Sequence, residues 1–229
     1  MNIVVTGASR GIGYQIAKQL LEEGGHRIFA VARNRDNLLK LRQYGKEENY
    51  SFLDFDLTQT DYSELISDIT NMFDKVDVLI NNAGLLINKP FKELTDKDFD
   101  DLFGANVKSA FKLVRELLPY FSRKAHVVNI SSMGGYQGSA KFPGMSLYSA
   151  SKGALAVLSE SMAEELKEQE IRVNALALGA VQTEMLEEAF PGYKAAVTAE
   201  EMAEFIVDFA LKAHSYFNGK IIPVSLSIP

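Results

Sequence analysis

Short apolar runs alternate with longer amphipathic segments along the whole chain. Several of the runs are β-branched and lack polar alternation, which is typical of strands covered on both faces. They predict strands at Ile3–Thr6, Arg27–Ala32, Ser51–Asp56, Val76–Asn81, His126–Ser131, Arg172–Leu178 and Lys220–Val224. The helical patterns predict helices at Gly13–Glu23, Arg35–Tyr44, Asp61–Phe73, Asp96–Leu118, Leu147–Glu168 and Ala199–Ala213.

The order of these elements predicts the fold class. Regular strand–helix alternation indicates an α/β fold in which helices flank a parallel sheet. The sequence contains no internal repeat, low-complexity tract or linker, so we expect residues 1–229 to form a single domain. Sheets of this kind bind ligands at the carboxyl ends of their strands, so residues that directly follow strands carry most information about function.

A glycine-rich turn, TGASRGIG, follows the first predicted strand and runs directly into a helix. Gly7, Gly11 and Gly13 allow a tight turn and a close approach of the backbone to a ligand. The start of the helix presents free N–H groups and the positive end of its dipole to a phosphate. A glycine pattern alone is weak evidence, but its place between strand and helix favours dinucleotide binding over a purely structural turn.

The end of the second strand bears on the choice of nicotinamide cofactor. No Asp or Glu follows HRIFAVA to bond the ribose hydroxyls of NAD. Arg33 stands there instead, and Arg10 lies within the glycine-rich turn. Two guanidinium groups can grip a phosphate monoester, so we expect NADP (NADPH) as the cofactor and consider NAD the poorer fit. Two solvated arginines would give the same pattern.

The stretch LYSASKGAL places a tyrosine and a lysine four residues apart where an apolar helix begins. Tyr148 and Lys152 therefore share one helix face. A tyrosine has a pKa of about 10, and an ammonium group at about 4 Å favours the phenolate by very roughly 1 to 4 kcal/mol. General acid catalysis gains when the pKa of the donor approaches the working pH. We therefore expect Tyr148 to donate a proton and Lys152 to lower the pKa of Tyr148.

Composition excludes several function classes. The chain has no cysteine, which excludes disulfides and thiolate chemistry, and its three histidines are not in a metal-ligand spacing, so we expect no metal site. A net charge of −6 without a basic patch gives no support for a nucleic-acid partner. No apolar stretch reaches the roughly 18 residues of a membrane span, and MNIVVTGASRGIG leaves no room for a signal peptide. We expect a cytoplasmic protein without a membrane partner.

Six motifs in this order make the chain resemble the short-chain dehydrogenase/reductase family, in its single-domain branch. They are TGASRGIG (6–13), NNAG (81–84), ANVKSAF (105–111), ISS (130–132), YSASK (148–152) and RVNALALGAVQT (172–183). The resemblance implies a Rossmann-type doubly wound sheet of seven mostly parallel strands, flanked by helices on both faces. It also implies an NADPH-dependent oxidoreductase that reduces a carbonyl compound to an alcohol by reversible hydride transfer.

The same resemblance implies a catalytic set of Asn106, Ser132, Tyr148 and Lys152. Tyr148 would act as the general acid/base, Ser132 would polarise the substrate carbonyl, and Lys152 would also bond the nicotinamide ribose. Asn106 would interrupt its helix and hold a water that links Lys152 to solvent. Ser131 is an alternative for the serine role, although the family pattern favours the second serine of ISS.

Cofactor contacts are implied along the strand ends. Asp56 stands where the family bonds the adenine amino group, and Leu57 adds a backbone contact. The family's usual Pro-Gly after the sixth strand is replaced here by Leu178 and Gly179, so this turn lacks the fixed φ of proline. The expected cofactor residues are Gly7, Ser9, Arg10, Gly11, Ile12, Gly13, Arg33, Asp56, Leu57, Asn82, Ala83, Gly84, Tyr148, Lys152, Gly179, Val181 and Thr183.

Two segments are expected to cover the substrate. The segment between Ser132 and Tyr148 is a few residues longer than the family commonly shows, and it predicts a flap, with a plain flexible loop as the alternative. A short lid is expected at about 184–198. The expected substrate contacts are Ser132, Tyr136, Phe142, Met145 and Tyr148. No Arg or Lys cluster marks an anionic substrate, and fatty-acyl, steroid, pterin, sugar and xenobiotic ketones all remain open.

Two alternatives to a carbonyl reductase remain. The chain could run as an alcohol dehydrogenase, because both directions use the same residues. It could also be a catalytically idle NADP-binding sensor or scaffold, although a complete catalytic set argues against this. The apolar helix after Tyr148 predicts a homo-oligomer, most simply a dimer, but a face buried within the chain would look identical. The resemblance implies a tetramer less strongly, because the glycine-rich C-terminal tail usual in the family is absent from the sequence.

Overall fold

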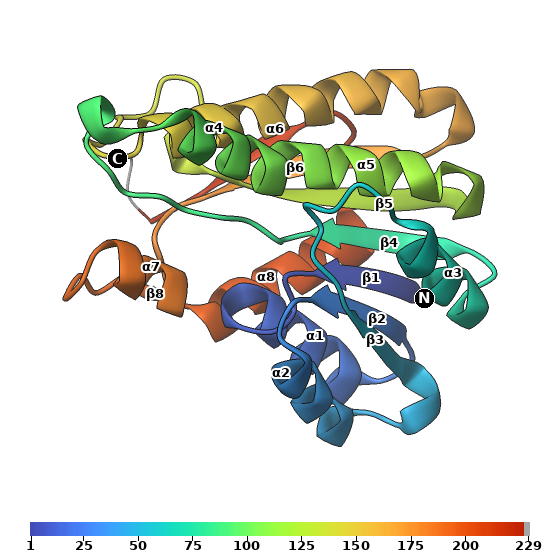
Figure 1. The fold of residues 1–229 in the computed structure, drawn as a ribbon. Coiled ribbons are helices and arrows are strands. Elements are labelled where there is room, and N and C mark those ends of the chain that lie inside the picture. The colour runs from blue at the N-terminus through green and yellow to red at the C-terminus, as the bar shows by residue number, and fades with distance from the viewer. Residues whose placement is uncertain (227–229) are drawn as a thin grey trace.

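The computed structural model describes residues 1–226, so the last three residues of the expected domain lie outside it. Within the described residues, a parallel sheet lies between two layers of helices (Figure 1). Its seven strands are β1 (Asn2–Thr6), β2 (Arg27–Ala32), β3 (Tyr50–Asp54), β4 (Val76–Asn81), β5 (Phe121–Ser132), β6 (Arg172–Leu178) and β9 (Ile221–Val224). They are ordered β3-β2-β1-β4-β5-β6-β9, and every neighbouring pair is parallel. This confirms the expected doubly wound fold.

The connections between strands are mostly helical. The α-helices are α1 (Gly11–Glu23), α2 (Arg35–Lys40), α3 (Ser63–Met72), α4 (Asp96–Phe103), α5 (Ser109–Leu117), α6 (Ser146–Glu165), α7 (Glu184–Ala189) and α8 (Ala199–Lys212). Two-residue strands, β7 (Val181–Gln182) and β8 (Val197–Thr198), pair with each other and enclose α7 in the sequence. Figure 1 shows α7 and β8 at the left, apart from the two helix layers. Single 3-10 turns span Leu41–Tyr44, Glu47–Asn49, Phe91–Glu93, Leu118–Tyr120, Met133–Gly135, Lys167–Gln169 and Ala213–Ser215.

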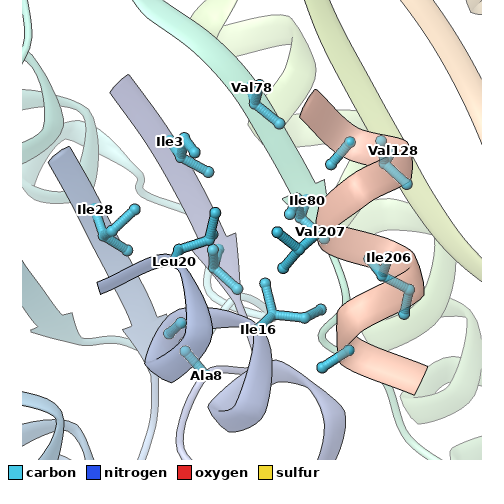
Figure 2. Close-up of a cluster of buried hydrophobic side chains, with 14 of the residues drawn as sticks. Ile3, Ala8, Ile16, Leu20, Ile28, Val78, Ile80, Val128, Ile206 and Val207 are labelled. Atoms are coloured by element: carbon cyan, nitrogen blue, oxygen red, sulfur yellow. The ribbon is translucent and has the colours of Figure 1, made fainter. Parts of the chain in front are cut away.

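Alternate residues of each strand point to opposite layers, so each face of the sheet has its own apolar core. On one face, Ile3 of β1 packs with Ile16 of α1 and Ile206 of α8, as Figure 2 shows. On the other face, the next residue of β1, Val4, packs with residues of α3, α5 and α6, among them Leu113. Burial on both faces explains why the strand sequences lack polar alternation.

Strand β5 and the helix before it differ from the sequence-based expectation. β5 begins at Phe121, five residues before the predicted start at His126, and its early part is polar. The pairing of β4 with β5 shifts register there, and Lys124 has a φ of 65°. The helix predicted over Asp96–Leu118 keeps its limits within one residue but is interrupted by a π turn, Gly104–Lys108.

Candidate active site

The glycine-rich turn after β1 is packed against the turn after β4. A Cβ on Gly13 would lie 2.3 Å from the carbonyl oxygen of Gly7 and 2.4 Å from Nδ2 of Asn82, so only glycine fits there. Asn82 Nδ2 donates to the carbonyl of Thr6 at 3.1 Å, and Thr6 Oγ1 accepts from the backbone N–H of Asn82 and Ala83. The NNAG segment therefore fixes the shape of the glycine-rich turn.

The start of α1 fits the diphosphate of a dinucleotide. The helix has no side-chain cap, and no acidic residue stands in its first turn. The backbone N–H groups of this turn can therefore bind phosphate oxygens in the field of the helix dipole. Gly11, the first residue of α1, has a φ of 54°, which glycine adopts without strain.

The ends of β2 and β3 form a groove that continues from this turn. Arg33 is exposed there, and Asp56 lies close by. Burial acts to raise the pKa of Asp56, but hydrogen bonds from Thr58 and the charge of Arg33 lower it overall, so this carboxyl is ionised. Sequence reasoning missed Arg35, which also lines the groove but is paired with Asp54 at 2.6 Å. Arg33 is therefore better placed than Arg35 to meet a ligand phosphate.

Arg10 lies between this groove and a second cavity, and it lines both. Its Nη1 is 2.5 Å from Oε1 of Glu188 in α7, and its Nη2 is 3.4 Å from Oε2. The sequence predicted Arg10 as a phosphate ligand, but it did not reveal this carboxylate partner. The pair connects the glycine-rich turn to the segment expected as a lid.

Tyr148 and Lys152 lie on the same face of α6, with Nζ of Lys152 5.9 Å from the centroid of the Tyr148 ring. Ser132, the last residue of β5, forms a hydrogen bond with the Tyr148 side chain. Ser131 instead donates to the carbonyl of Lys152 at 2.8 Å and is buried. Of the two serines of ISS, Ser132 is therefore the one that meets Tyr148, and Ser131 attaches α6 to β5.

Burial dominates the pKa values of this pair. Burial raises the pKa of Tyr148, and the hydrogen bond with Ser132 acts in the opposite direction. Burial lowers the pKa of Lys152 to about 8. Nζ of Lys152 donates to the carbonyl of Ile130 at 2.8 Å and lies over the Tyr148 ring. The sequence-based expectation was that Lys152 lowers the pKa of Tyr148, whereas in this structure burial dominates and raises it.

The π turn between α4 and α5 directs Asn106 inward. Its Oδ1 accepts from the backbone N–H of Leu85 at 2.7 Å, while Nδ2 donates to the carbonyl of Leu85 and to Oγ of Ser151, each at 2.9 Å. A Cβ on Gly84 would lie 3.0 Å from Asn106 Oδ1 and 3.2 Å from Lys152 Nζ. Asn106 thus joins the chain after NNAG to α6, beside Lys152.

A cavity of about 580 Å³ opens in front of Tyr148. It brings together many of the residues predicted from sequence, namely Arg10, Gly11, Ile12, Asn82, Gly84, Ser132, Phe142, Met145, Tyr148, Lys152, Gly179, Val181 and Thr183. The adjoining groove adds Gly7, Ser9, Arg33, Asp56, Leu57 and Ala83. The cofactor and substrate residues predicted from widely separated motifs therefore lie along one continuous surface.

Three predicted site residues line neither the cavity nor the groove within residues 1–226. Gly13 is buried in the turn, and Asn106 is buried behind Gly84. Tyr136 was expected to contact substrate, but the structure places it outside the lining, with its carbonyl accepting from Ser139 Oγ and Lys141 Nζ. Its carbonyl instead makes hydrogen bonds within the flap (residues 133–147).

Sequence reasoning also missed apolar residues that line the cavity. Six of them come from two segments: Leu85 and Leu86 after NNAG, and Met185, Leu186, Phe190 and Tyr193 of the lid (residues 184–198). None of these six belongs to a motif, and the mixture of acidic and apolar residues in EMLEEAF (184–190) was a signal for Met185, Leu186 and Phe190 alone.

Hydrogen bonds join the chain after NNAG to the flap and to the lid. The backbone N–H of Lys89 donates to the carbonyl of Gly144 at 3.0 Å, and Asn88 Nδ2 donates to the carbonyl of Ala189 at 2.9 Å. Thr183 begins α7 by accepting from the N–H of Leu186 at 3.2 Å. These hydrogen bonds therefore hold in place the segments that form the apolar end of the cavity.

Comparison with known proteins connects these features to a family. A family model described as short chain dehydrogenase matches residues 1–194. The 3-oxoacyl-(acyl-carrier-protein) reductase of Rickettsia bellii is 31% identical, over 97% of this chain and 94% of that protein. The reductase of the same name from Aquifex aeolicus is 30% identical, with the same two coverages of 97% and 94%.

Solved structures show the same fold. A short-chain dehydrogenase/reductase from Brucella melitensis, described as a glucose/ribitol dehydrogenase, superposes with a TM-score of 0.89 at 25% identity, covering 100% of this chain and 96% of that one. A 4-hydroxyisoleucine dehydrogenase mutant in complex with NADH and succinate superposes with a TM-score of 0.83 at 26% identity, with coverages of 98% and 97%. Over residues 1–226, no helix has the length and apolar character needed to cross a membrane, and no group of three or more potential metal ligands is found.

Proposed function

Because the chain belongs to the short-chain dehydrogenase/reductase family, we propose that it uses NADPH to reduce a carbonyl compound to an alcohol. The family binds nicotinamide cofactors and acts on small molecules. The observation that carries the proposal is the hydrogen-bonded pair of Ser132 and Tyr148, which lines the same cavity as Gly179 and Val181 on the expected nicotinamide side.

In this proposal the cofactor, Tyr148, Ser132 and Lys152 each have a separate role. NADPH held along the groove and the cavity would supply a hydride to the carbonyl carbon and be released as NADP⁺. Tyr148 transfers its proton to the carbonyl oxygen, and Ser132 donates a hydrogen bond that stabilises the negative charge developing on that oxygen. A lysine with a pKa of about 8 exchanges protons near neutral pH, so Lys152 suits the role of restoring the Tyr148 proton.

A preference for NADPH over NADH is part of the proposal. Arg33 follows β2 at the position where an acidic residue would bind the ribose hydroxyls of NAD, and Arg10 lies at the adjoining turn. Both side chains line the groove expected to hold the adenosine half of the cofactor. Two cations there favour the additional phosphate of NADP, which they can bind through paired hydrogen bonds.

The activity is tested by following NADPH and NADH oxidation over a panel of ketones and aldehydes. The panel includes a 3-oxoacyl thioester, because two relatives of this chain are named 3-oxoacyl-(acyl-carrier-protein) reductases. We expect turnover that prefers NADPH, and a smaller preference in Arg33→Ala. NADPH binding without reduction of any carbonyl would contradict the proposal and favour a sensor or scaffold. A preference for NADH would refute the roles of Arg10 and Arg33.

A homodimer is also part of the proposal. Helices α4, α5 and α6 form one layer beside the sheet (Figure 1). This layer exposes apolar side chains, with Phe99 46%, Phe111 41% and Val157 61% exposed. Exposed apolar side chains gathered on one layer are typical of protein interfaces. Light scattering should give twice the chain mass for the wild type and the single-chain mass for Phe111→Glu combined with Val157→Glu. A monomeric wild type would refute the dimer.

A further inference from the structure

The cavity beyond Tyr148 has an apolar end formed by three segments. One wall comes from the chain after NNAG, a second from the flap and a third from the lid. Their side chains in the lining include Leu85, Leu86, Phe142, Met145, Leu186 and Tyr193. A ligand that reaches Ser132 and Tyr148 through these segments exchanges water for hydrocarbon and aromatic surface.

Both basic side chains that line the cavity already have partners within the protein. Of the described residues in its lining, Arg10, Lys152 and Glu184 carry a charge. Lys152 donates to the carbonyl of Ile130 at 2.8 Å, and Arg10 is paired with Glu188. Glu184 is exposed at the start of α7 and would repel an anion. An anionic substrate would thus enter an apolar cavity without a cation ready to bind it, which is unfavourable.

The basic side chains of the flap and the lid do not change this conclusion. Lys141 donates to the carbonyl of Tyr136 at 2.8 Å and to Oγ of Ser139 at 2.7 Å, and it is absent from the lining. Lys194 is exposed and also absent from the lining. Helix α7 itself carries three glutamates and no basic residue.

Two aromatic side chains of the lining are unusually exposed. Phe142 of the flap and Tyr193 of the lid are each 52% exposed. Covering such surface with an apolar ligand is favourable by about 25 cal/mol for each Å² removed from water. Exposed aromatic residues on two different segments of one cavity therefore fit a ligand whose body is itself apolar.

We infer that the substrate is an uncharged carbonyl compound with an apolar body, held between the flap and the lid, and that carboxylate and phosphate-bearing ketones are rejected. This inference rests on the proposed function and restricts its substrate class. The apolar body lies against residues such as Phe142 and Tyr193, while the carbonyl reaches Ser132 and Tyr148.

Matched ligands test this inference without requiring turnover. The methyl ester of 7-oxooctanoic acid and the free carboxylate of the same acid differ mainly in charge. Their binding to Tyr148→Phe in the presence of NADPH is measured by calorimetry, since this variant lacks the proposed proton donor. We expect the ester to bind at least about tenfold more tightly, a difference of about 1.4 kcal/mol. Equal or tighter binding of the carboxylate, or failure of the ester to bind, would overturn the inference.

Variants locate the binding surface. Phe142→Ser and Tyr193→Ser should each weaken binding of the ester by about three- to tenfold. Tyr216→Ser is the matched control, because Tyr216 is 83% exposed but outside the lining, and it should leave binding unchanged. Leu86→Arg should improve binding of the carboxylate relative to the ester. Turnover by the wild type is scored separately, so binding of the ester without its reduction would contradict only the proposed function.

Discussion

Arg10 of the glycine-rich turn, which lines both the groove and the cavity, forms an ion pair with Glu188 of α7, with Nη1 and Oε1 2.5 Å apart. Their side chains are 44% and 62% exposed, and exposed pairs of this kind contribute about 0 to 1 kcal/mol. Under the proposed function, the phosphate of NADP and the Glu188 carboxylate compete for one guanidinium group. The proposal therefore predicts that Glu188 opposes binding of NADP and has no such effect on NAD.

Replacing Glu188 by glutamine should strengthen NADPH binding. The amide removes the competing charge, so the dissociation constant for NADPH should fall by about two- to fivefold, while that for NADH stays unchanged. Fluorescence titration with each cofactor measures both constants. Glu187→Gln is the control, because Glu187 accepts from the N–H of Gly192 and does not contact Arg10. Equal changes for the two cofactors would show that Arg10 does not bind the additional phosphate.

Gly84→Ala should reduce turnover without unfolding the protein. The added methyl group would lie 3.0 Å from Asn106 Oδ1 and 3.2 Å from Lys152 Nζ, so one of these side chains must move. Displacement of a positioned group by a fraction of an ångström is expected to lower kcat by about tenfold. Circular dichroism and steady-state kinetics provide the two measurements.

Gly104→Ala is the matched control for Gly84→Ala. A Cβ on Gly104 meets no atom within 4 Å, and its φ of −57° is helical. This variant should keep wild-type kcat and gain about 0.5 to 1 kcal/mol of unfolding free energy. Full activity in Gly84→Ala, or an equal loss in both variants, would contradict the proposed arrangement around Lys152.

His126 should make the protein less stable at acidic pH. Its Nδ1 lies 2.9 Å from the carbonyl of Ala210, so Nδ1 carries the hydrogen and Nε2 accepts from Asn174 Nδ2 at 3.0 Å. Burial lowers the pKa of His126 to about 4; the hydrogen bond to Ala210 acts in the opposite direction, and His214 adds to the lowering. Below about pH 6.5 the unfolded chain binds a proton that the folded chain does not, so stability falls as the pH decreases toward 4.

The expected size of this effect is about 2 kcal/mol of unfolding free energy between about pH 7.5 and about pH 5. Urea unfolding of the wild type and of His126→Gln at both pH values measures it, because glutamine cannot take up the proton. Burial also lowers the pKa of His26, but His26 is present in both proteins, so its contribution cancels in the comparison of the wild type with His126→Gln. An identical loss of stability in the two proteins would refute the assignment to His126.

Local signals in the sequence predicted much of the fold and of the site. Strands and helix starts are determined largely by residues close in the sequence. The predicted bounds of these elements therefore agree with the observed bounds within a few residues. Gly13 could be predicted because the turn admits no side chain there. The interruption of the helix at Asn106 followed from the family pattern, as did the choice of Ser132 over Ser131.

Features that depend on distant contacts could not be predicted in the same way. The early part of β5 is polar and becomes a strand by pairing with β4 at Phe121. The two-residue strands β7 and β8 exist only because they meet each other. Arg10 and Glu188 are 178 positions apart, so their pairing is invisible in the sequence. The pKa values of Tyr148 and Lys152 depend on burial, which the i, i+4 spacing alone does not report.

The most direct test of Tyr148 as the proton donor is the single-turnover rate of NADPH oxidation by the wild type and by Tyr148→Phe, with a substrate found in the carbonyl panel. Loss of a general acid should slow this rate by about 10²- to 10⁴-fold and leave the NADPH dissociation constant nearly unchanged. Tyr136→Phe is the control and should keep the wild-type rate, since Tyr136 lies outside the cavity lining. A Tyr148→Phe rate equal to that of the wild type would contradict the proposed role of Tyr148.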